Sequence, residues 1–389
     1  MNRVPASTGA APTKRLAVVW RNFGPYHYAR LRALDAHFLA TGIQIVGATD
    51  KHRWTVDAGG ERVITLFPDD AGASPAAVCR RLWAALDKVD PDVLLIPSYS
   101  PYPAWVCLVW GILHRRTRII MTESNAFDAP RSAPGETIKR ILLKFYHGAM
   151  VGGSTAGEYL VQLGFPAKKI RRGYDCVDVE TFATLAEVAR KDAAATRSRL
   201  QLPERFFVCP ARLVAEKNHS RLLEAFADFQ GMPGNSDMHL LLCGTGHLEA
   251  TLRAKIAREN IQNIELRGFV QMEDMAALYA LCIAMILPSL IEAWGLVVNE
   301  ALACGAFVLV SNRAGAGFDL VLPGRTGLRF DPISSEELVM TMTTATEYFS
   351  NCDDSRHEEI LSVARRFSPE FFGRNVAECV SLFSKESGN

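Results

Sequence analysis

Two glutamates, Glu292 and Glu300, lie eight positions apart in an almost wholly apolar stretch, PSLIEAWGLVVNEALACG (residues 288–305). A strand-like run ends just before this stretch, so a helix is expected to begin near Ala293 or Trp294. Free N–H groups at a helix N-terminus favour anionic or hydroxyl-rich ligands. Along a helix that rises 1.5 Å per residue, the two carboxylates would lie about 12 Å apart. That distance suits a ligand with hydroxyls at both ends and an anionic middle, as in a nucleotide sugar. A plainer alternative stays open, with Glu292 as a helix N-cap and Glu300 as a solvated helix residue.

Two cations follow another expected strand, in CPARLVAEKNHSRLLEAF (residues 209–226). Arg212 ends the strand, and Lys217 comes five residues later, just before a helical pattern. Arginine offers a bidentate fork and lysine a point charge, so the two together could hold a diphosphate. The alternative is an ordinary charged surface loop in which Glu216 pairs with either cation.

Glycine-containing turns follow the next two expected strands. CGTGHLEATL (residues 243–252) places Gly244, Thr245 and Gly246 where the backbone could approach a ligand closely, although tight turns between a strand and a helix need glycine in any case. LRGFV (residues 266–270) would turn at the end of the following strand, where backbone groups could read a nucleobase. Ligands of parallel α/β folds lie outside the carboxyl ends of the strands. All four strand ends are therefore expected to face one cleft.

The elements that must position these residues are short apolar runs that alternate with helical patterns. Strands of this kind, separated by helices, are typical of parallel sheets built from βαβ units. Two such series predict an α/β protein with two doubly wound, Rossmann-like domains that face each other across a cleft. The expected strands are residues 15–20, 43–49, 92–98, 118–122 and 148–153 in the first series, and 206–212, 239–246, 264–270, 284–289 and 306–311 in the second.

The break between the two series falls in a polar, helix-prone segment that contains no strand-like run. We expect an N-terminal domain over residues 15–178, a linker over residues 179–203 and a C-terminal domain over residues 204–366. An amphipathic segment over residues 367–389 is expected to form a last helix that crosses back to the N-terminal domain.

Composition excludes several classes of protein. The 389 residues carry a net charge of +1, so there is no overall field of the kind that favours nucleic acid. The longest apolar run, residues 104–113, has about half the length that a membrane span needs and is expected to form a buried or membrane-surface helix. The nine cysteines are scattered without a CxxC pair, which fits reduced thiols. The first residues lack the apolar core of a signal peptide, and we therefore expect a cytoplasmic protein.

Four segments, in this order and spacing, resemble a known family. ARLVAEKNHSRLLEAF, CGTGHLEATL, IELRGFVQMEDMAALYALC and LPSLIEAWGLVVNEALACGAFVLVSNRAGAGFDLV are similar to the donor-binding half of retaining GT-B glycosyltransferases that use nucleotide sugars. This large group includes bacterial mannosyl-, glucosyl- and N-acetylglucosaminyltransferases. The resemblance is specific over residues 206–330 and weaker before residue 178. It implies a GT-B fold with an N-terminal acceptor domain and a C-terminal donor domain.

The resemblance also implies roles for single residues. Arg212 and Lys217 would bind the diphosphate, Glu292 would contact sugar hydroxyls, and Glu300 would hold the ribose. Phe269 and Val270 would flank the base. The remaining donor contacts would come from the glycine turn and from the start of the helix, namely Gly244, Thr245, Gly246, Ala293, Trp294, Gly295 and Leu296.

The loop after the first strand departs from the family pattern. Relatives often carry a Gly-Gly turn there, close to the donor phosphates, whereas RNFGPYHYARLRAL (residues 21–34) offers Gly24 alone for close approach. In the same loop Tyr26, His27 and Arg30 are available to bind an acceptor. A structural role for each of the three is the alternative.

A second departure follows a central strand, where many relatives place a histidine that points at the transferred sugar. RIIMTESNAFDAPR (residues 118–131) has no histidine at that position. Glu123 could replace it as an electrostatic partner for positive charge that develops on the sugar ring. The alternative is that Glu123 is an ordinary acid in a loop at the end of a strand.

The function that the resemblance implies is retaining transfer of a hexose-type sugar from a nucleoside-diphosphate sugar to a hydroxyl acceptor, with no cofactor and no metal. The acceptor would be a glycan, a lipid-linked glycan or a small molecule. Two alternatives stay open: an epimerase of the same fold, and a nucleotide-sugar-binding protein without turnover. VDPDVLL (residues 89–95) contains an Asp-x-Asp, which binds metal in another class of glycosyltransferase, but it precedes a strand at the end remote from the cleft. Basic and aromatic residues within 114–118 and 138–147 suit either peripheral contact with an anionic membrane or a solvated helix face.

Overall fold

The N-terminal half of the chain forms a parallel sheet of seven strands in the order β3-β2-β1-β4-β5-β6-β7. The computed structural model describes residues 13–47, 62–69, 73–99, 102–350 and 354–384. Strand order reverses between β1 and β4, which is the feature that defines a doubly wound sheet. The strands of this sheet are β1 (Arg15–Trp20), β2 (Leu39–Val46), β3 (Val63–Phe67), β4 (Val93–Pro97), β5 (Thr117–Thr122), β6 (Gly148–Val151) and β7 (Ile170–Arg172).

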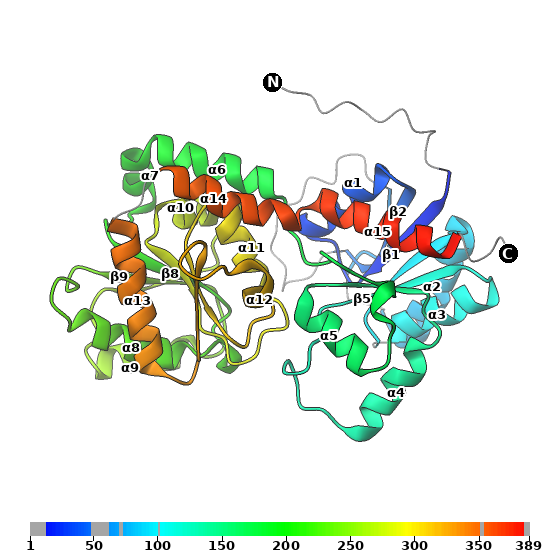
Figure 1. The fold of residues 1–389 in the computed structure, drawn as a ribbon, viewed down its shortest axis with the longest axis horizontal. Coiled ribbons are helices and arrows are strands. Elements are labelled where there is room, and N and C mark those ends of the chain that lie inside the picture. The colour runs from blue at the N-terminus through cyan, green and yellow to red at the C-terminus, as the bar shows by residue number, and fades with distance from the viewer. Residues whose placement is uncertain (1–12, 48–61, 70–72, 100–101, 351–353, 385–389) are drawn as a thin grey trace.

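The C-terminal half forms a second parallel sheet, with six strands in the order β10-β9-β8-β11-β12-β13. Its order reverses between β8 and β11, and the two sheets lie side by side, each covered by helices (Figure 1). The strands are β8 (Phe206–Pro210), β9 (His239–Cys243), β10 (Ile264–Gly268), β11 (Ala284–Leu287), β12 (Val308–Ser311) and β13 (Gly327–Phe330). The predicted α/β fold with two doubly wound sheets is confirmed.

Helices connect the strands of both sheets. In the first half they are α1 (Pro25–Asp35), α2 (Pro75–Val89), α3 (Tyr102–Leu113), α4 (Ala133–Leu143) and α5 (Ser154–Gln162). In the second half they are α6 (Val179–Lys191), α7 (Ala193–Leu200), α8 (His219–Gln230), α9 (Glu249–Arg258), α10 (Met272–Leu281), α11 (Leu296–Ala303), α12 (Ala316–Leu320), α13 (Ser335–Ser350), α14 (Asp354–Ala364) and α15 (Pro369–Ser384). Among the helices of the described ranges, none has the length and apolar character needed to cross a bilayer.

Each sheet is buried on both faces, because helices cover both. Successive side chains of a strand point to opposite sides, so each strand contributes to both apolar layers. In β1, Leu16 and Val18 pack toward α1 and α15, whereas Ala17 and Val19 pack toward α2, α3 and α5. In the second sheet, Val208 packs toward α6, α10, α11 and α14, and Phe207 packs toward α8 and α13. The result is two apolar layers per sheet, which hold the strand ends of each sheet in fixed register.

The last described helix, α15, belongs by packing to the N-terminal sheet. Phe372 and Cys379 are fully buried there, in the same apolar cluster as Leu16 and Ile119. Figure 1 shows α15 running beside α1 above this sheet, although the two helices are more than 300 residues apart in sequence. The chain therefore crosses between the two sheets twice, once before α6 and once before α15.

Candidate functional site

The two adjacent strands at the reversal of the second sheet, β8 and β11, carry the predicted charged residues at their carboxyl ends. Lys217 ends a short 3-10 helix after β8, and Glu292 follows β11. The Lys217 Nζ atom forms an ion pair with Glu292 Oε2, and the two side chains are only 12% and 17% exposed. Ser289 Oγ donates to the same carboxylate oxygen at 3.3 Å. The structure thus joins two residues that are 75 positions apart in sequence.

Arg212 lies on the same loop after β8 as Lys217, and its side chain is exposed. In the part of the chain that the structure describes, no hydrogen bond or ion pair engages its guanidinium. Its backbone is held, because the Arg212 carbonyl oxygen lies 3.0 Å from His219 Nε2. Burial lowers the pKa of His219, so the imidazole is neutral at physiological pH and serves as a structural contact.

The glycine turn after β9 packs directly on the loop that carries Arg212. A Cβ atom on Gly244 would lie 2.2 Å from the Ala211 carbonyl oxygen, and one on Gly246 would lie 2.2 Å from the Leu213 carbonyl oxygen. The Leu213 N–H donates to the carbonyl oxygen of Thr245 at 3.0 Å. Both glycines are therefore required by backbone packing, whatever ligand the turn contacts. The Thr245 side chain is exposed.

The segment after β11 differs from the expected helix. We expected α11 to begin near Ala293 or Trp294, which is wrong, because it begins at Leu296 with Gly295 as N-cap at φ 99°. Glu292 instead forms an isolated parallel bridge with Ala314, outside any helix. Helical rise therefore does not set the distance from Glu292 to Glu300. The Trp294 ring is 1% exposed, and its Nε1 donates to Asn299 Oδ1 at 2.8 Å, so this side chain belongs to the core.

Glu300 is partly buried, and both of its carboxylate oxygens accept hydrogen bonds from tyrosines. Tyr26 Oη donates to Oε1 at 2.7 Å, and Tyr279 Oη donates to Oε2 at 2.9 Å. Burial raises the pKa of Glu300, while both hydroxyls oppose that rise. Tyr26 comes from α1 of the N-terminal domain, so this bond connects the two domains. Its hydroxyl, which we expected to be available to an acceptor, is engaged here.

Glu123 stands at the end of β5, on the N-terminal side of the cleft. Its side chain is exposed, and nearby protein atoms partly desolvate the carboxylate. Burial and then the negative charge of Glu292 raise the pKa of Glu123, whereas the charges of Arg30 and Lys217 lower it. The structure therefore brings Glu123 within electrostatic range of the Lys217–Glu292 pair, across the two domains. In the described residues, its carboxylate takes part in no hydrogen bond.

The other N-terminal residues of the predicted site have structural contacts. Gly24 caps α1, and its N–H donates to His27 Nδ1 at 3.1 Å. Arg30 is 2% exposed, and its guanidinium donates to the Tyr26 and Tyr174 carbonyl oxygens at 3.2 and 3.0 Å. These contacts favour the structural alternative for His27 and Arg30, and their acceptor roles stay predictions.

Two further residues complete the surroundings of the site, and neither lies in a periodic pattern of the sequence. Asn125, two positions after Glu123, donates from Nδ2 to the Ala293 carbonyl oxygen at 2.9 Å and so links the domains. Asp175 is 3% exposed, and its Oδ2 atom is buried without a hydrogen-bond partner among the described residues. Burial and then the charge of Glu123 raise the pKa of Asp175 well above its usual value. The neighbouring charge of Arg30 opposes that rise.

Phe269 and Val270 lie after β10, next to the glycine turn in the order of the sheet. Phe269 is 40% exposed, and Val270 packs against the apolar cluster of α10 and α11. Their role beside a base stays a prediction.

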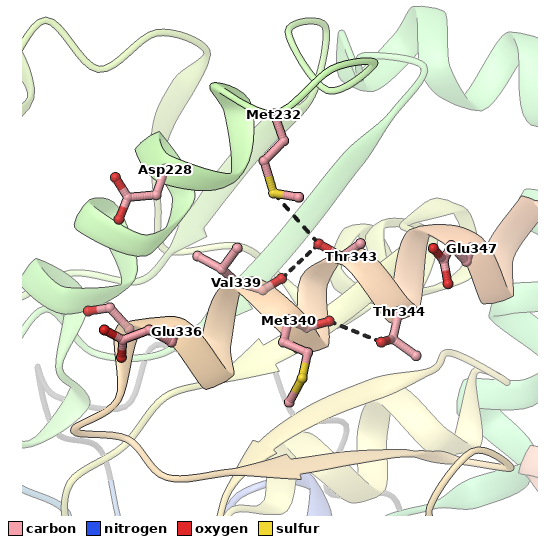
Figure 2. Close-up of a pocket in the computed structure, with 9 residues that line it drawn as sticks. Asp228, Met232, Glu336, Val339, Met340, Thr343, Thr344 and Glu347 are labelled. Carbon is pink, nitrogen blue, oxygen red and sulfur yellow. Dashed lines mark hydrogen bonds between the residues drawn. The ribbon is translucent and has the colours of Figure 1, made fainter.

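A cavity of about 490 Å³ lies elsewhere, on the outer surface of the C-terminal domain between α8 and α13. Figure 2 shows its lining, in which Thr343 Oγ1 lies 4.0 Å from Met232 Sδ and donates to the Val339 carbonyl oxygen at 3.0 Å. Its walls combine exposed methionines with carboxylates and include none of the predicted site residues. This cavity is therefore separate from the strand ends that carry the charged residues.

The contacts of the Asp-x-Asp motif, Asp90 and Asp92, do not favour metal binding. Asp90 and Asp92 form ion pairs with Arg15 and Arg116 at the opposite end of the sheet from the site. Across the described ranges, no three His, Cys, Asp or Glu side chains are grouped so that they could hold a metal ion.

Comparison with known proteins assigns part of the chain. Residues 191–349 match the family model for glycosyl transferases group 1. A stretch of 149 residues is 30% identical to a GDP-mannose-dependent monoacylated alpha-(1-6)-phosphatidylinositol monomannoside mannosyltransferase of Corynebacterium glutamicum, over 36% of this chain and 38% of that protein. A stretch of 137 residues is 32% identical to the D-rhamnosyltransferase WbpZ of Pseudomonas aeruginosa, over 34% of each chain. The chain thus spans little more than a third of the length of these relatives.

Solved structures extend the similarity to the whole fold. HepE of Anabaena, in complex with UDP, superposes with a TM-score of 0.73 at 19% identity and covers 95% of this chain and 100% of its own. Sucrose-phosphate synthase of Thermosynechococcus elongatus superposes with a TM-score of 0.72 at 16% identity, over 96% and 100% of the two chains. Together with the two parallel sheets, these matches show a two-domain α/β fold like that of the solved glycosyltransferase structures, in which residues 191–349 are similar to glycosyl transferases group 1.

Proposed function

We propose that this chain is a retaining glycosyltransferase, which moves a hexose-type sugar from a nucleoside-diphosphate sugar to a hydroxyl acceptor. The observation that carries the proposal is the meeting of Lys217, Glu292 and Glu123 at strand ends of both domains. Ligands of doubly wound sheets bind where strand order reverses, and here the charged residues lie at the reversal of the second sheet. The matched mannosyl- and rhamnosyltransferases support the same assignment.

The donor would enter between the two domains. Arg212 and Lys217 would bind its diphosphate, Arg212 as a bidentate fork and Lys217 as a point charge. Lys217 would then exchange part of its contact with Glu292 for phosphate oxygens, which leaves the Glu292 carboxylate to accept hydrogen bonds from sugar hydroxyls. Glu300 would hold the ribose once the Tyr26 hydroxyl gives way.

In the reaction, the bond from the anomeric carbon to the leaving phosphate oxygen breaks, and a bond to the acceptor oxygen forms on the same face. The acceptor proton passes to the leaving phosphate. Negative charge that builds on the diphosphate would be stabilised by Arg212 and Lys217. Positive charge on the sugar ring would be stabilised by the Glu123 carboxylate, which lies near the same pair. The chemistry so written requires no metal and no protein nucleophile.

The first test is Lys217→Ala. Loss of a hydrogen bond to a charged group should weaken nucleoside-diphosphate binding by about 1.5–3 kcal/mol, with binding of the nucleoside alone almost unchanged. Calorimetry of both ligands measures the difference. Lys255→Ala is a matched control, because Lys255 is 13% exposed and ion-paired as well, but with Glu224 and Glu259 on the outer helices. Equal losses for nucleoside and nucleoside diphosphate would remove Lys217 from the phosphate site.

Two measurements separate the proposal from its alternatives. Proton NMR of the product, formed with EDTA present, gives the anomeric configuration, and an inverted product would overturn retention. An epimerase would convert the donor without an acceptor, and a binding protein would convert nothing. A strict metal requirement would instead support metal binding by Asp90 and Asp92.

A further inference from the structure

Helix α3 of the N-terminal domain exposes large apolar side chains on one of its faces. Trp105 is 50% exposed, Val109 is 48% exposed and Leu113 is 66% exposed. These positions follow one another at intervals of four residues, so they lie on the same side of the helix. Ile112, which is 38% exposed, extends the same side. The opposite side of α3 is buried against the sheet through Cys107 and Trp110.

Helix α4 and the residues just after it show the same arrangement. Ile138 is 56% exposed, Ile141 is 51% exposed and Phe145 is 45% exposed, at intervals of three and four residues. Leu143 is the side chain of this helix that is buried in the domain core. Several exposed apolar side chains at helical spacing on neighbouring elements form the kind of patch that marks an interaction site.

Side-chain contacts connect the segments that carry the two helices. Arg118 joins their C-terminal ends, because its Nε donates to the Phe145 carbonyl oxygen at 2.8 Å and its Nη1 donates to that of Gly111 at 2.9 Å. Lys139, in the middle of α4, places its Nζ 5.6 Å from the ring centre of Tyr99, which precedes α3. The Tyr99 carbonyl oxygen accepts from Trp105 Nε1 at 2.8 Å. Figure 1 shows α4 at the lower edge of the N-terminal domain, below α3. We name as the α3–α4 surface the seven side chains Trp105, Val109, Ile112, Leu113, Ile138, Ile141 and Phe145.

The charges in the segments that carry the α3–α4 surface are mostly positive. Residues 102–122 contain no acid, and Glu136 is the only acid in residues 129–157. The Glu136 carboxylate accepts hydrogen bonds from Lys139 and Tyr159, so its charge is already balanced. The side chains of Arg115, Arg140 and Lys144 are exposed and make no ion pair within the described ranges. An apolar face bordered by unpaired cations matches the interface of an anionic bilayer.

We propose that the α3–α4 surface docks on the surface of an anionic lipid bilayer. Apolar side chains enter the boundary between headgroups and acyl chains, while the long arms of Arg140 and Lys144 reach the headgroup phosphates. A second copy of the chain fits this surface less well, because a symmetric contact would place its cations against one another.

Docking in this way would bring the cleft close to the bilayer. Residues 123–132 form the connection from Glu123, at the end of β5, to the first residue of α4. An acceptor embedded in the bilayer would then approach the transferred sugar along this connection. That second statement rests on the proposed function, whereas bilayer docking does not depend on sugar transfer.

The test is sedimentation of the full chain with vesicles. The wild-type protein should bind vesicles that contain phosphatidylglycerol, bind weakly to pure phosphatidylcholine, and be released by salt. Arg140→Glu with Lys144→Glu should lower the affinity at least about tenfold. Ile138→Asp with Ile141→Asp should abolish binding. Met340→Asp is the matched control, because Met340 is 60% exposed on α13 of the other domain and lies at the cavity in Figure 2.

Melting temperature and nucleoside-diphosphate affinity should stay at wild-type values in every variant, which separates failure of docking from failure of folding or of the proposed function. Absence of wild-type binding to anionic vesicles would overturn the proposal, and so would equal loss in Met340→Asp. Light scattering that reveals a dimer lost in Ile138→Asp with Ile141→Asp would assign the surface to a second copy and likewise overturn it.

Discussion

Glu300 shows how the protein itself satisfies the carboxylate that is expected to hold the ribose. A carboxylate that is largely shielded from water needs a hydrogen bond on each oxygen, and Tyr26 and Tyr279 supply them. The two tyrosines differ in origin, since Tyr279 shares a domain with Glu300 and Tyr26 comes from the other one. If ribose hydroxyls bind Glu300, the Tyr26 bond is the one that domain movement can release.

Tyr26→Phe should therefore tighten nucleoside-diphosphate binding by about 1 kcal/mol, roughly fivefold, because a competing hydrogen bond is removed. Tyr279→Phe should weaken binding, since it removes support that remains in the complex. Calorimetry of both variants measures the contrast. Weaker binding in Tyr26→Phe would mean that its hydroxyl stays on Glu300 when the ligand is bound.

Asp175 makes stability depend on pH. Below the ordinary aspartate pKa of about 4, the carboxyl is protonated in both the folded and the unfolded protein, so its ionisation does not change the folding stability. As the pH rises above it, the unfolded chain ionises while the folded chain holds the proton, because burial raises the Asp175 pKa. The contribution of Asp175 to stability thus falls with rising pH. Asp175→Asn should raise the melting temperature at neutral pH and match the wild type near pH 4. Destabilisation at neutral pH would show instead an ionised Asp175 paired with Arg30.

At the residue scale, sequence reasoning could place a residue in the fold where its chemistry coincides with a strand end. Arg212, Lys217, Glu292 and Glu123 all follow apolar runs, and the parallel fold brings such ends to one edge. It could not anticipate that Glu292 would pair with Lys217, because that contact depends on the order of strands in the sheet. No sequence pattern indicates that Asp175 is buried, because its burial arises from the packing of the interdomain segment.

Among the elements, the loops after β8 and β9 act as one unit. Gly246→Ala would place a Cβ atom 2.2 Å from the Leu213 carbonyl oxygen, in backbone that cannot rotate away. The strain should cost about 1–3 kcal/mol of folding stability and, by shifting Arg212, also weaken nucleoside-diphosphate binding. Thermal unfolding and calorimetry measure the two effects. Gly231→Ala is the control, because its Cβ would lie 3.4 Å from the nearest atom at φ −66°. Normal binding in Gly246→Ala would show that the turn does not position Arg212.

The bounds of strands and helices depend partly on contacts that a local sequence pattern does not contain. The ten expected strands all exist, since buried parallel strands are short apolar runs. The three that were not expected, β3, β7 and β13, are edge strands, and VITLF, IRR and GLRF carry too little apolar pattern to be distinguished from loops. The start of α11 was misplaced because the bridge from Glu292 to Ala314, a tertiary contact, extends the preceding segment.

Several polar contacts hold the two domains together across the cleft. Asp319 is the most enclosed of their carboxylates, with a side chain only 6% exposed. Its Oδ2 accepts from the Ser154 N–H at 2.7 Å and from Ser154 Oγ at 2.8 Å, and Arg172 lies 3.4 Å from Oδ1. A ligand that enters between the domains must be compatible with this contact or break it.

Asp319→Ala should favour separation of the domains, because it leaves the Ser154 donors without their partner. Small-angle X-ray scattering of the unliganded variant should give a larger radius of gyration than the wild type, with a smaller difference when nucleoside diphosphate is present. Asp237→Ala is the control, since Asp237 pairs with Arg205 inside the C-terminal domain. An unchanged radius would mean that other contacts, such as Asn125 with Ala293, hold the closed form alone.

The position of α15 has a consequence for synthesis on the ribosome. About 200 residues lie between the end of β7 at Arg172 and the start of α15 at Pro369. At 5–20 residues per second, a ribosome needs roughly 10–40 s to make them. Throughout that time the face of the first sheet that α15 covers, including Leu16 and Ile119, lacks its helix. The second sheet, with α6 beside it, can be completed earlier. The half of the protein that is translated first is thus the half that finishes folding last, and its open apolar face is a binding site for chaperones on the nascent chain.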